Sequence, residues 1–336
     1  MPYQQEHEAE VLSAVKQFAQ SVNSGRKVVA DMSMLVAATS NLSLANLDFW
    51  ERLIRWEFSR ELKNTIPSKW KFWTQPTPFL TWIDLCSEDG FKRQKTLRTL
   101  SGAAPNGFFF AIAVRRLNDW VPQVREAARE KLPIVAKHTD PELVVDVLCA
   151  TLPHWNSWGR MEDKDKQVLI EITCIEKIGL ALKSRILSTT SGPMTSVLSQ
   201  VGRAETLDRY LDEIARKAIQ PSVRAKSYRC LLEGKMAWFA GRKWEWTDKR
   251  YCKGHFKPII RERNVLVTSP SLEILISAAT DRSPIVRRVA GEMLIRELAK
   301  IGTESLKLAH LLASDKSPSV AERGKFALKR LKNSDL

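Results

Sequence analysis

The spacing of apolar residues predicts helices along most of the chain. Between residues 43 and 63, apolar side chains recur at steps of three and four, which places them on one stripe of a helix. Glycine and proline fall mainly between such segments, and patterns typical of strands are rare. Three stripes consist of Leu47, Trp50, Ile54, Phe58 and Leu62; of Val121, Val124, Ala128, Leu132 and Val135; and of Val286, Ala290, Leu294 and Leu298. We therefore predict an all-α protein.

A short motif of the form Asp-x-x-Pro-x-Val-Arg recurs along the chain. It is complete at 119–125 and 281–287, and shorter versions begin at Pro221 and Asp315. The valines of the motif are separated by 99, 63 and 34 positions, close to three, two and one times a unit of about 33 residues. In each unit Asp or Ser can cap a helix, and proline suits the first turn. Val and Ala then present a thin face that a neighbouring helix can approach.

This motif resembles the HEAT repeat, in which pairs of helices stack into a curved α-solenoid. The resemblance implies a solenoid of HEAT-like repeats, and it is strongest at 117–136 and 281–331. We expect one continuous solenoid with an N-terminal helical region, a HEAT-like repeat region and two insertions. Their boundaries are 1–100 for the first region, 101–336 for the second, and 153–165 and 238–262 for the insertions.

The arginine that follows the valine of the motif has two possible roles. In HEAT repeats such an arginine often pairs with an aspartate of a neighbouring unit and holds the stack together. Alternatively, Arg125, Arg224 and Arg287 contact phosphate groups of a ligand. We favour the structural role for all three arginines.

The charge balance favours a polyanionic partner. The chain has 336 residues, of which 53 are Lys or Arg and 38 are Asp or Glu, giving a formal net charge of +15. Each basic group that lies near a phosphate releases a condensed counterion, so a surplus of this size promotes binding to nucleic acid. General solubility of a basic protein is the alternative interpretation.

The sequence also indicates a compartment. The N-terminal stretch MPYQQEHEAE has no basic region followed by an apolar one, as a signal peptide would have. The longest apolar run, at 107–114, is far shorter than a bilayer span. Five cysteines form no Cys-x-x-Cys pair, which suits free thiols in a reducing compartment. Cys252 and His255 have the spacing of half a zinc site, without a visible second half. We expect a cytoplasmic protein with no metal and no other cofactor.

Aromatic and basic residues alternate in the segment GRKWEWTDKRYCKGHFK at 241–257. Basic side chains position a phosphate backbone, and exposed rings stack on bases for about 1–3 kcal/mol per base. Similar composition occurs in SKWKFWTQPTPFLTW at 68–82 and in PHWNSWGRMEDKD at 153–165. The alternative is that the tryptophans anchor an insertion while the lysines face water. The expected stacking residues are Trp155, Trp158, Trp244, Trp246 and Tyr251, and the expected DNA-backbone contacts are Arg160, Arg242, Lys243, Lys249, Arg250, Lys253 and Lys257.

The carboxylates near these rings suggest one reaction. No nucleophilic triad, glycine-rich phosphate loop or nuclease cluster is evident in the sequence. A carboxylate beside aromatic rings in a basic cleft suits hydrolysis of an N-glycosidic bond, because it can stabilise the oxocarbenium character of the sugar and orient water. Enzymes that excise bases must also hold the exposed nucleotide, which rings can do.

Helical repeats, basic charge and tryptophan-rich segments together resemble the HEAT-like alkylpurine DNA glycosylases of the AlkD type. That family carries a Trp-Trp-Asp-Ser-Val-Asp motif whose last aspartate is catalytic. The nearest match here is His-Trp-Asn-Ser-Trp-Gly at 154–159, in which Trp155 and Ser157 agree and Gly159 occupies the position of the catalytic aspartate. The resemblance therefore implies that a nearby carboxylate has that role. The candidates are Glu162, Asp163, Glu245 and Asp248.

Two hypotheses follow from these patterns. The first is a monofunctional DNA glycosylase that acts on double-stranded DNA, removes an alkylated or bulky hypermodified base and leaves an abasic site, in DNA repair or anti-phage defence. The second is a non-catalytic HEAT-repeat scaffold that binds nucleic acid or an acidic protein partner. Whether the four carboxylates are held in ion pairs distinguishes the two hypotheses, because carboxylates held in ion pairs are poor candidates for catalysis.

Overall fold

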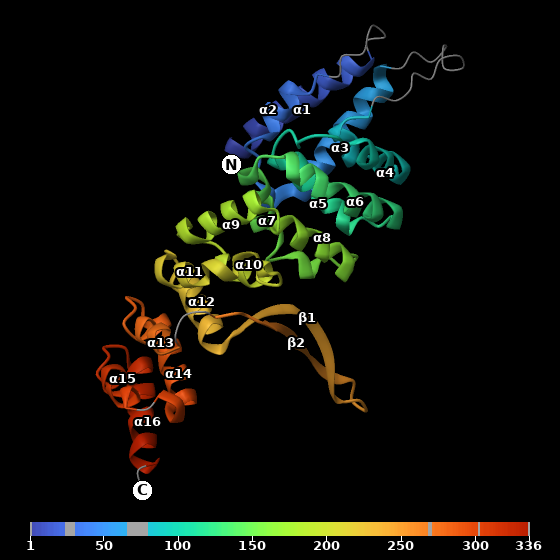
Figure 1. The fold of residues 1–336 in the computed structure, drawn as a ribbon. Helices are drawn as coiled ribbons and strands as arrows, with labels where there is room; N and C mark the ends of the chain where they lie inside the picture. The colour runs from blue at the N-terminus through green and yellow to red at the C-terminus, as the bar shows by residue number, and fades with distance from the viewer. Residues whose placement is uncertain (1, 24–30, 66–79, 268–270, 302, 335–336) are drawn as a thin grey trace. The chain divides into compact units, whose positions relative to one another are not determined.

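The computed structural model describes residues 2–23, 31–65, 80–267, 271–301 and 303–334. In these ranges the chain is mostly helical, with 16 α-helices and one two-stranded sheet (Figure 1). The prediction of a helical protein is thus confirmed, except for the sheet. Most of the aromatic segment at 68–82 lies outside the described residues.

The chain divides into two compact units, Met1–Ile178 and Gly179–Leu336. The boundary expected at residue 100 lies inside the first unit. The helices of the first unit are α1 (Pro2–Asn23), α2 (Ser33–Thr39), α3 (Leu47–Thr65), α4 (Gly90–Thr99), α5 (Gly107–Arg115), α6 (Pro122–His138), α7 (Pro141–Thr151) and α8 (Asp163–Thr173), with short 3₁₀ helices η1 (Leu44–Asn46), η2 (Trp82–Cys86), η3 (Arg116–Asn118) and η4 (Trp155–Ser157). The boundary between the units falls in α9 (Glu176–Ser188).

The second unit contains the remaining helices and the sheet. Its elements are α10 (Met194–Val201), η5 (Glu205–Tyr210), α11 (Leu211–Lys217), α12 (Pro221–Glu233), β1 (Lys235–Asp248), β2 (Lys253–Asn264), α13 (Ser271–Ala279), α14 (Pro284–Ile301), α15 (Glu304–Ala313) and α16 (Pro318–Ser334). None of the helices in the described ranges is both long enough and apolar enough to cross a membrane.

The recurring motif begins a helix at each of its four occurrences. Its proline is the first residue of α6, α12, α14 and α16, where the missing backbone N–H is not needed. The valine two residues later is fully buried in all four helices; these valines are Val124, Val223, Val286 and Val320. The motif therefore sets both the start of the helix and the face that it buries.

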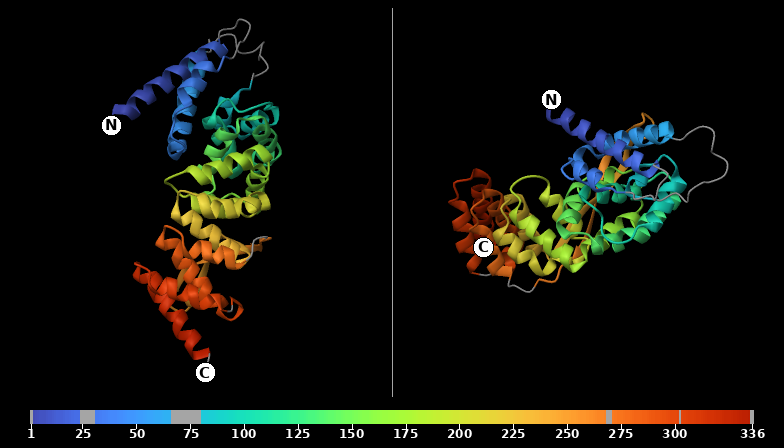
Figure 2. Two further views of the ribbon diagram at one scale, coloured as in Figure 1. Left: turned by 60° about the vertical axis from the view of Figure 1, so that its left-hand side comes forward. Right: turned by 90° about the horizontal axis from the view of Figure 1, so that it is seen from above.

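Within each unit, alternate helices pack against one another. In the first unit α6 packs on both α4 and α8, and α5 packs on α7. In the second unit α12 packs on α10 and α14, α14 packs on α16, and α13 packs on α15. Figure 2 shows the helices from two further directions. The buried stripes predicted from the sequence supply the apolar surface for this packing.

An arginine near the start of a helix links successive helices in the same way at several places. In α14, Arg287 Nη1 donates to the carbonyl of Asp281, 2.8 Å away, while its Nε donates to the carboxylate of Asp315 at 2.6 Å. In α12, Arg224 bonds the carbonyl of Ala218 and the carboxylate of Asp281. The structural role predicted for these motif arginines is confirmed, because each joins its own helix start to an aspartate before the next motif helix.

The first unit repeats this arrangement. Arg125 donates to the carbonyl of Asp119 at 2.9 Å and pairs with Glu162 at 3.2 Å. Arg93, which carries no complete motif around it, bonds the carbonyl of Ser87 and both carboxylate oxygens of Asp119. An arginine outside the recognised motif thus makes the same contacts.

The segment predicted as an insertion at 238–262 forms an antiparallel hairpin of β1 and β2. The prediction of helices alone was wrong here. The strand signal is an alternation with a period of two, in which Trp244 and Trp246 alternate with Lys243 and Glu245. In Figure 1 the hairpin extends away from α12.

Candidate nucleic-acid interface

The base of the hairpin is anchored to helices of the second unit. Met236 is fully buried, and Arg263 donates to the carboxylate of Asp208 at 2.6 Å and to the carbonyl of Gly202 at 2.7 Å. Gln200 Nε2 donates to the carbonyl of Phe239, and Lys226 Nζ donates to that of Ala237. These contacts fix the first few residue pairs of the hairpin on α10, η5 and α12.

Beyond this base, three rings cluster on one face of the hairpin. Trp244 pairs directly with Phe256 in the strand register, and Trp246 pairs with Gly254. The ring of Trp244 lies 5.0 Å from that of Phe256 and 5.5 Å from that of Trp246, both edge to face. A Cβ at Gly254 would lie 2.6 Å from the Trp244 ring, so glycine allows the indole to lie across the strand.

The ring cluster keeps much of its surface in contact with solvent. Trp246 is 50% exposed, Phe256 is 61% exposed and Trp244 is 38% exposed. Tyr251, in the turn, is 72% exposed. The expected stacking residues of this segment therefore remain accessible to a ligand.

The turn between the strands is held by Asp248. Its carboxylate accepts hydrogen bonds from the backbone N–H groups of Arg250 and Tyr251, at 2.9 and 3.4 Å. Cys252 closes the turn with a positive φ of 51°. Lys253 Nζ lies 5.7 Å from the centre of the Tyr251 ring. The expectation that Asp248 is a catalytic group gains no support, because its carboxylate has a structural task.

The opposite face of the hairpin is basic. Lys243 and Lys257 are directly paired across the strands, and Glu245 forms an ion pair with Lys257 at 3.2 Å. Glu245 thus offsets part of the repulsion between two lysines, which argues against a catalytic role. The hairpin from Lys235 to Asn264 contains nine Lys or Arg and three Asp or Glu. Among the described residues, no carboxylate pairs with Arg242, Lys243, Lys249 or Arg250.

The candidate residues at 153–165 lie in the first unit and behave differently. Trp155 is fully buried, so the expectation that it stacks on a nucleotide is wrong. Trp158 is half-buried and lines a small hollow with residues of η1, α5 and α7. The Arg160 side chain is exposed, and its backbone N–H donates to the Asn118 side chain at 2.9 Å.

The two carboxylates of this segment belong to the start of α8. Glu162 precedes the helix, and its carboxylate lies 3.0 Å from Lys164 and 3.2 Å from Arg125. The hydrogen bond from Lys164, with a further contribution from Arg125, holds the pKa of Glu162 below its usual value. Asp163 is the first residue of α8, where a carboxylate interacts favourably with the helix N-terminus. A lowered pKa makes Glu162 a poor candidate for a general base near neutral pH.

A cavity that the sequence did not reveal lies in the first unit. It has a volume of about 550 Å³ and is lined by ten charged residues together with Asn118 and Trp120. The charged residues are Arg52, Arg55, Arg93, Arg115, Arg116, Arg160, Asp48, Glu51, Glu88 and Asp119. The two adjacent arginines at 115 and 116 are the one feature of the local sequence that indicates this charged cavity. The cavity itself depends on α3, α4, η3 and the segment after η4 coming together.

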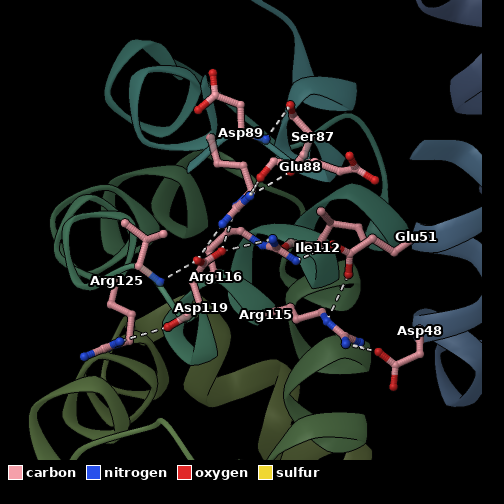
Figure 3. Close-up of polar contacts among 12 residues, drawn as sticks. Asp48, Glu51, Ser87, Glu88, Asp89, Ile112, Arg115, Arg116, Asp119 and Arg125 are labelled. Carbon is pink, nitrogen blue, oxygen red and sulfur yellow. Dashed lines mark hydrogen bonds and ion pairs between the residues drawn. The ribbon is translucent and has the colours of Figure 1, made fainter. Parts of the chain in front are cut away.

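An ion-pair network forms one wall of this cavity (Figure 3). Arg116 pairs with Glu51 at 2.6 Å and with Asp119 at 3.2 Å. Arg115 pairs with Glu51 and with Asp48, and Arg93 pairs with Asp119. Burial, together with the neighbouring charge of Arg116, lowers the pKa of Arg115.

Among the described residues, no group of three or more His, Cys, Asp and Glu side chains could hold a metal ion. Cys252 lies in the hairpin turn and His255 lies opposite Glu245 on β2. A comparison with models of known protein families finds no match to this chain, and a search of curated protein sequences finds none either.

Proposed function

We propose that this protein binds double-stranded DNA through the β1–β2 hairpin, which projects from a stack of HEAT-like repeats. The repeat assignment is supported by the proline that begins each motif helix and by the arginine that bonds the next aspartate. It also agrees with the packing of alternate helices in each unit.

The observation that carries the DNA-binding proposal is the division of the outer hairpin into two faces. One face holds the exposed rings of Trp244, Trp246 and Phe256. The other face and the turn hold Lys243, Lys249 and Arg250, which pair with no carboxylate in the described part of the chain. Exposed rings and unbalanced cations are both unfavourable for folding alone, because apolar surface meets water and like charges repel. A partner that offers phosphates and flat bases satisfies both groups.

The geometry favours duplex DNA over other polyanions. A two-stranded β-ribbon fits the major groove of B-form DNA, whereas the major groove of an RNA duplex is too deep and narrow for side chains to read. Flanking phosphates would then meet Lys249 and Arg250 of the turn. An acidic protein partner gives no specific role to a cluster of rings beside the cations.

Base excision is not assigned to the four candidate carboxylates. Glu162 and Glu245 are held in ion pairs, and Asp248 holds the turn. Asp163 stands at the start of α8. The glycosylase hypothesis, including a role in repair or anti-phage defence, therefore gains no support from Glu162, Glu245 or Asp248.

The salt dependence of DNA affinity tests the binding proposal. We compare the wild-type protein with a triple variant, Lys249→Gln, Arg250→Gln and Lys253→Gln, by fluorescence anisotropy with a labelled duplex. Each lost phosphate contact lowers the log–log slope by about 0.9, so the triple variant should lose about 2.7. A matched control removes three exposed lysines of the same unit that lie outside the hairpin, by Lys316→Gln, Lys325→Gln and Lys329→Gln. An equal loss in the control, or none in the hairpin variant, contradicts the proposal; tighter binding to RNA or to an acidic peptide contradicts the choice of DNA.

A further inference from the structure

The cavity in the first unit contains arginines that its ion-pair network does not use. Arg93, Arg115 and Arg116 are engaged by Asp48, Glu51 and Asp119. The side chain of Arg52 donates to the backbone carbonyl of Asp48, and no carboxylate in the described part of the chain pairs with it. The guanidinium groups of Arg55 and Arg160 likewise have no carboxylate partner among those residues. Three cationic groups thus line the cavity with only Glu88 as a further carboxylate.

The charges in the cavity wall leave an excess of about two positive charges. Three arginines balance three carboxylates in the network, and Arg52, Arg55 and Arg160 outnumber Glu88 by two. The network cannot rearrange easily to neutralise this excess, because the side chains of Arg93 and Asp119 are only 3% and 1% exposed. An anion with two negative charges would match the excess.

An exposed ring adjoins these cations. Trp120 lines the cavity and is 66% exposed. The backbone on both sides of Trp120 is held in place: Asp119 is bound by two arginines, and the Val121 N–H donates to the Asp119 carboxylate at 2.9 Å. An exposed flat ring that lines a cationic cavity offers a stacking surface for a planar group.

We propose that this cavity binds a nucleotide through a terminal phosphate monoester, with the base stacked on Trp120. A monoester carries a charge of about −1.5 to −2 at neutral pH, which matches the excess of the cavity, whereas an internal phosphodiester carries about −1. Guanidinium groups bind phosphate oxygens through paired N–H donors. The volume of about 550 Å³ falls within the range of small-molecule sites. A free nucleotide and a phosphorylated strand end share this chemistry.

The cavity proposal does not depend on the hairpin. Its residues all lie in the first unit, and the hairpin lies in the second. The variant with Lys249, Arg250 and Lys253 replaced by glutamine should therefore bind a mononucleotide as the wild-type protein does. Failure of either proposal leaves the other open to its own test.

The first experiment measures binding of deoxyadenosine 5′-monophosphate, deoxyadenosine and inorganic phosphate to the full chain by isothermal titration calorimetry. We expect the monophosphate to bind at least tenfold more tightly than the nucleoside. The triple variant Arg52→Gln, Arg55→Gln and Arg160→Gln should lose at least tenfold in affinity. A matched triple variant of exposed cations in the same unit, Lys95→Gln, Arg98→Gln and Lys137→Gln, should retain the affinity of the wild-type protein. No binding of the monophosphate, or equal losses in the two triple variants, overturns the proposal.

The role of the ring is tested separately. Trp120→Ala should weaken binding of the monophosphate and leave binding of inorganic phosphate unchanged. If inorganic phosphate binds as tightly as the nucleotide and Trp120→Ala affects neither, the site binds anions without recognising a base, and the proposal is wrong. A melting curve for each variant establishes that it is folded.

Short oligonucleotides distinguish the two sources of the monoester. In the hairpin variant background, a single strand with a 5′-phosphate is compared with the same strand without it. Tighter binding of the phosphorylated strand, lost in the Arg52, Arg55 and Arg160 variant, assigns the cavity to strand ends. Equal binding of the two strands, with the mononucleotide still bound, assigns it to free nucleotides.

Discussion

Arg224 donates two hydrogen bonds, each 2.9 Å long, to the carboxylate of Asp281, although 57 positions separate the two residues. The equivalent pair of Arg287 and Asp315 spans 28 positions. The difference of 29 positions is close to the length of the hairpin from Lys235 to Asn264. The pair therefore links the helices on either side of the hairpin in the sequence. As a result, α12 packs on α14 although the hairpin is inserted between them.

Removing the aspartate of this pair should destabilise the protein strongly. The side chain of Arg224 is 1% exposed, so Asp281→Ala leaves a buried charge without its partner, which costs about 3–5 kcal/mol. The control is Asp212→Ala, which breaks an exposed pair with Arg216 within α11 and should cost less than about 1 kcal/mol. Urea unfolding measures both. Equal small effects would show that the Arg224 pair does not hold the repeat together.

Trp155 should contribute to folding and not to DNA binding. Its side chain is fully buried, so Trp155→Ala removes a large packed ring and should lower the free energy of unfolding by about 3–5 kcal/mol. At a temperature where the variant is still folded, its affinity for duplex DNA should equal that of the wild-type protein. Thermal melting and fluorescence anisotropy provide the two measurements. If the Trp155→Ala variant is as stable as the wild-type protein but binds duplex DNA more weakly, Trp155 contacts the DNA and this prediction is wrong.

Trp246 should show the opposite behaviour. It is half exposed on the outer hairpin, so Trp246→Ala should change the Tm little and weaken DNA binding by about 1–3 kcal/mol, the contribution of one stacked base. Trp56→Ala is the matched control, because Trp56 is 58% exposed on α3 and lies far along the chain from the hairpin. Loss of affinity in the control alone would place the DNA contact outside the hairpin.

We expect that the four candidate carboxylates do not catalyse the release of a base from DNA. The protein is incubated at stoichiometric amounts with duplexes that carry alkylated or glucosylated bases, and abasic sites are then cleaved with alkali. We expect no strand breaks, because Glu162, Glu245 and Asp248 are engaged in ion pairs or a turn. Strand breaks that disappear when the four residues are replaced by their amides would establish catalysis by this set.

The pair of Arg287 and Asp315 should make stability depend on acidic pH. The hydrogen bond from Arg287 is the largest cause that lowers the pKa of Asp315 below its ordinary value, so the carboxylate favours the folded state when it is ionised. This contribution is complete above the pKa of the unfolded chain, near 3.9, and is lost as the pH falls through the lower pKa of the folded state. Asp315→Asn should therefore lower the Tm at pH 7 and approach the wild-type Tm as the pH falls below about 4. A constant difference in Tm would contradict this account.

The hairpin shows why part of the fold was not predicted from the sequence. Its strand pattern is short, because the clear alternation on β1 runs only through the residues around Trp244 and Trp246. Each strand is stabilised by backbone pairing with the other, and this pairing is not visible in a local apolar pattern. The sequence does not show why position 254 is a glycine. The reason appears only in the structure, where the Trp244 ring lies across Gly254 and leaves no room for a side chain.

The candidate sites divide in the same way. The exposure of the rings and cations of the hairpin was predictable, because most residues in a dense run of rings and cations cannot be buried together. The state of Trp155 was not, since a tryptophan in a polar segment can pack inward when a neighbouring helix offers space. The arginine cavity was invisible, because Arg55 and Arg160 stand more than a hundred positions apart in the sequence.

The sequence by itself determined where the helices begin and which face of each is buried, because proline, caps and the apolar period act within a few residues. It also determined the positive charge of the segment around Lys249. Only the tertiary structure decided which carboxylates are engaged in ion pairs and which arginines line the same cavity. Two of the ion pairs in the cavity wall, Arg93 with Asp119 and Arg116 with Glu51, join residues that are 26 and 65 positions apart. Such partners are chosen by helix packing, which brings distant charges into a space where they must neutralise one another or remain available to a ligand.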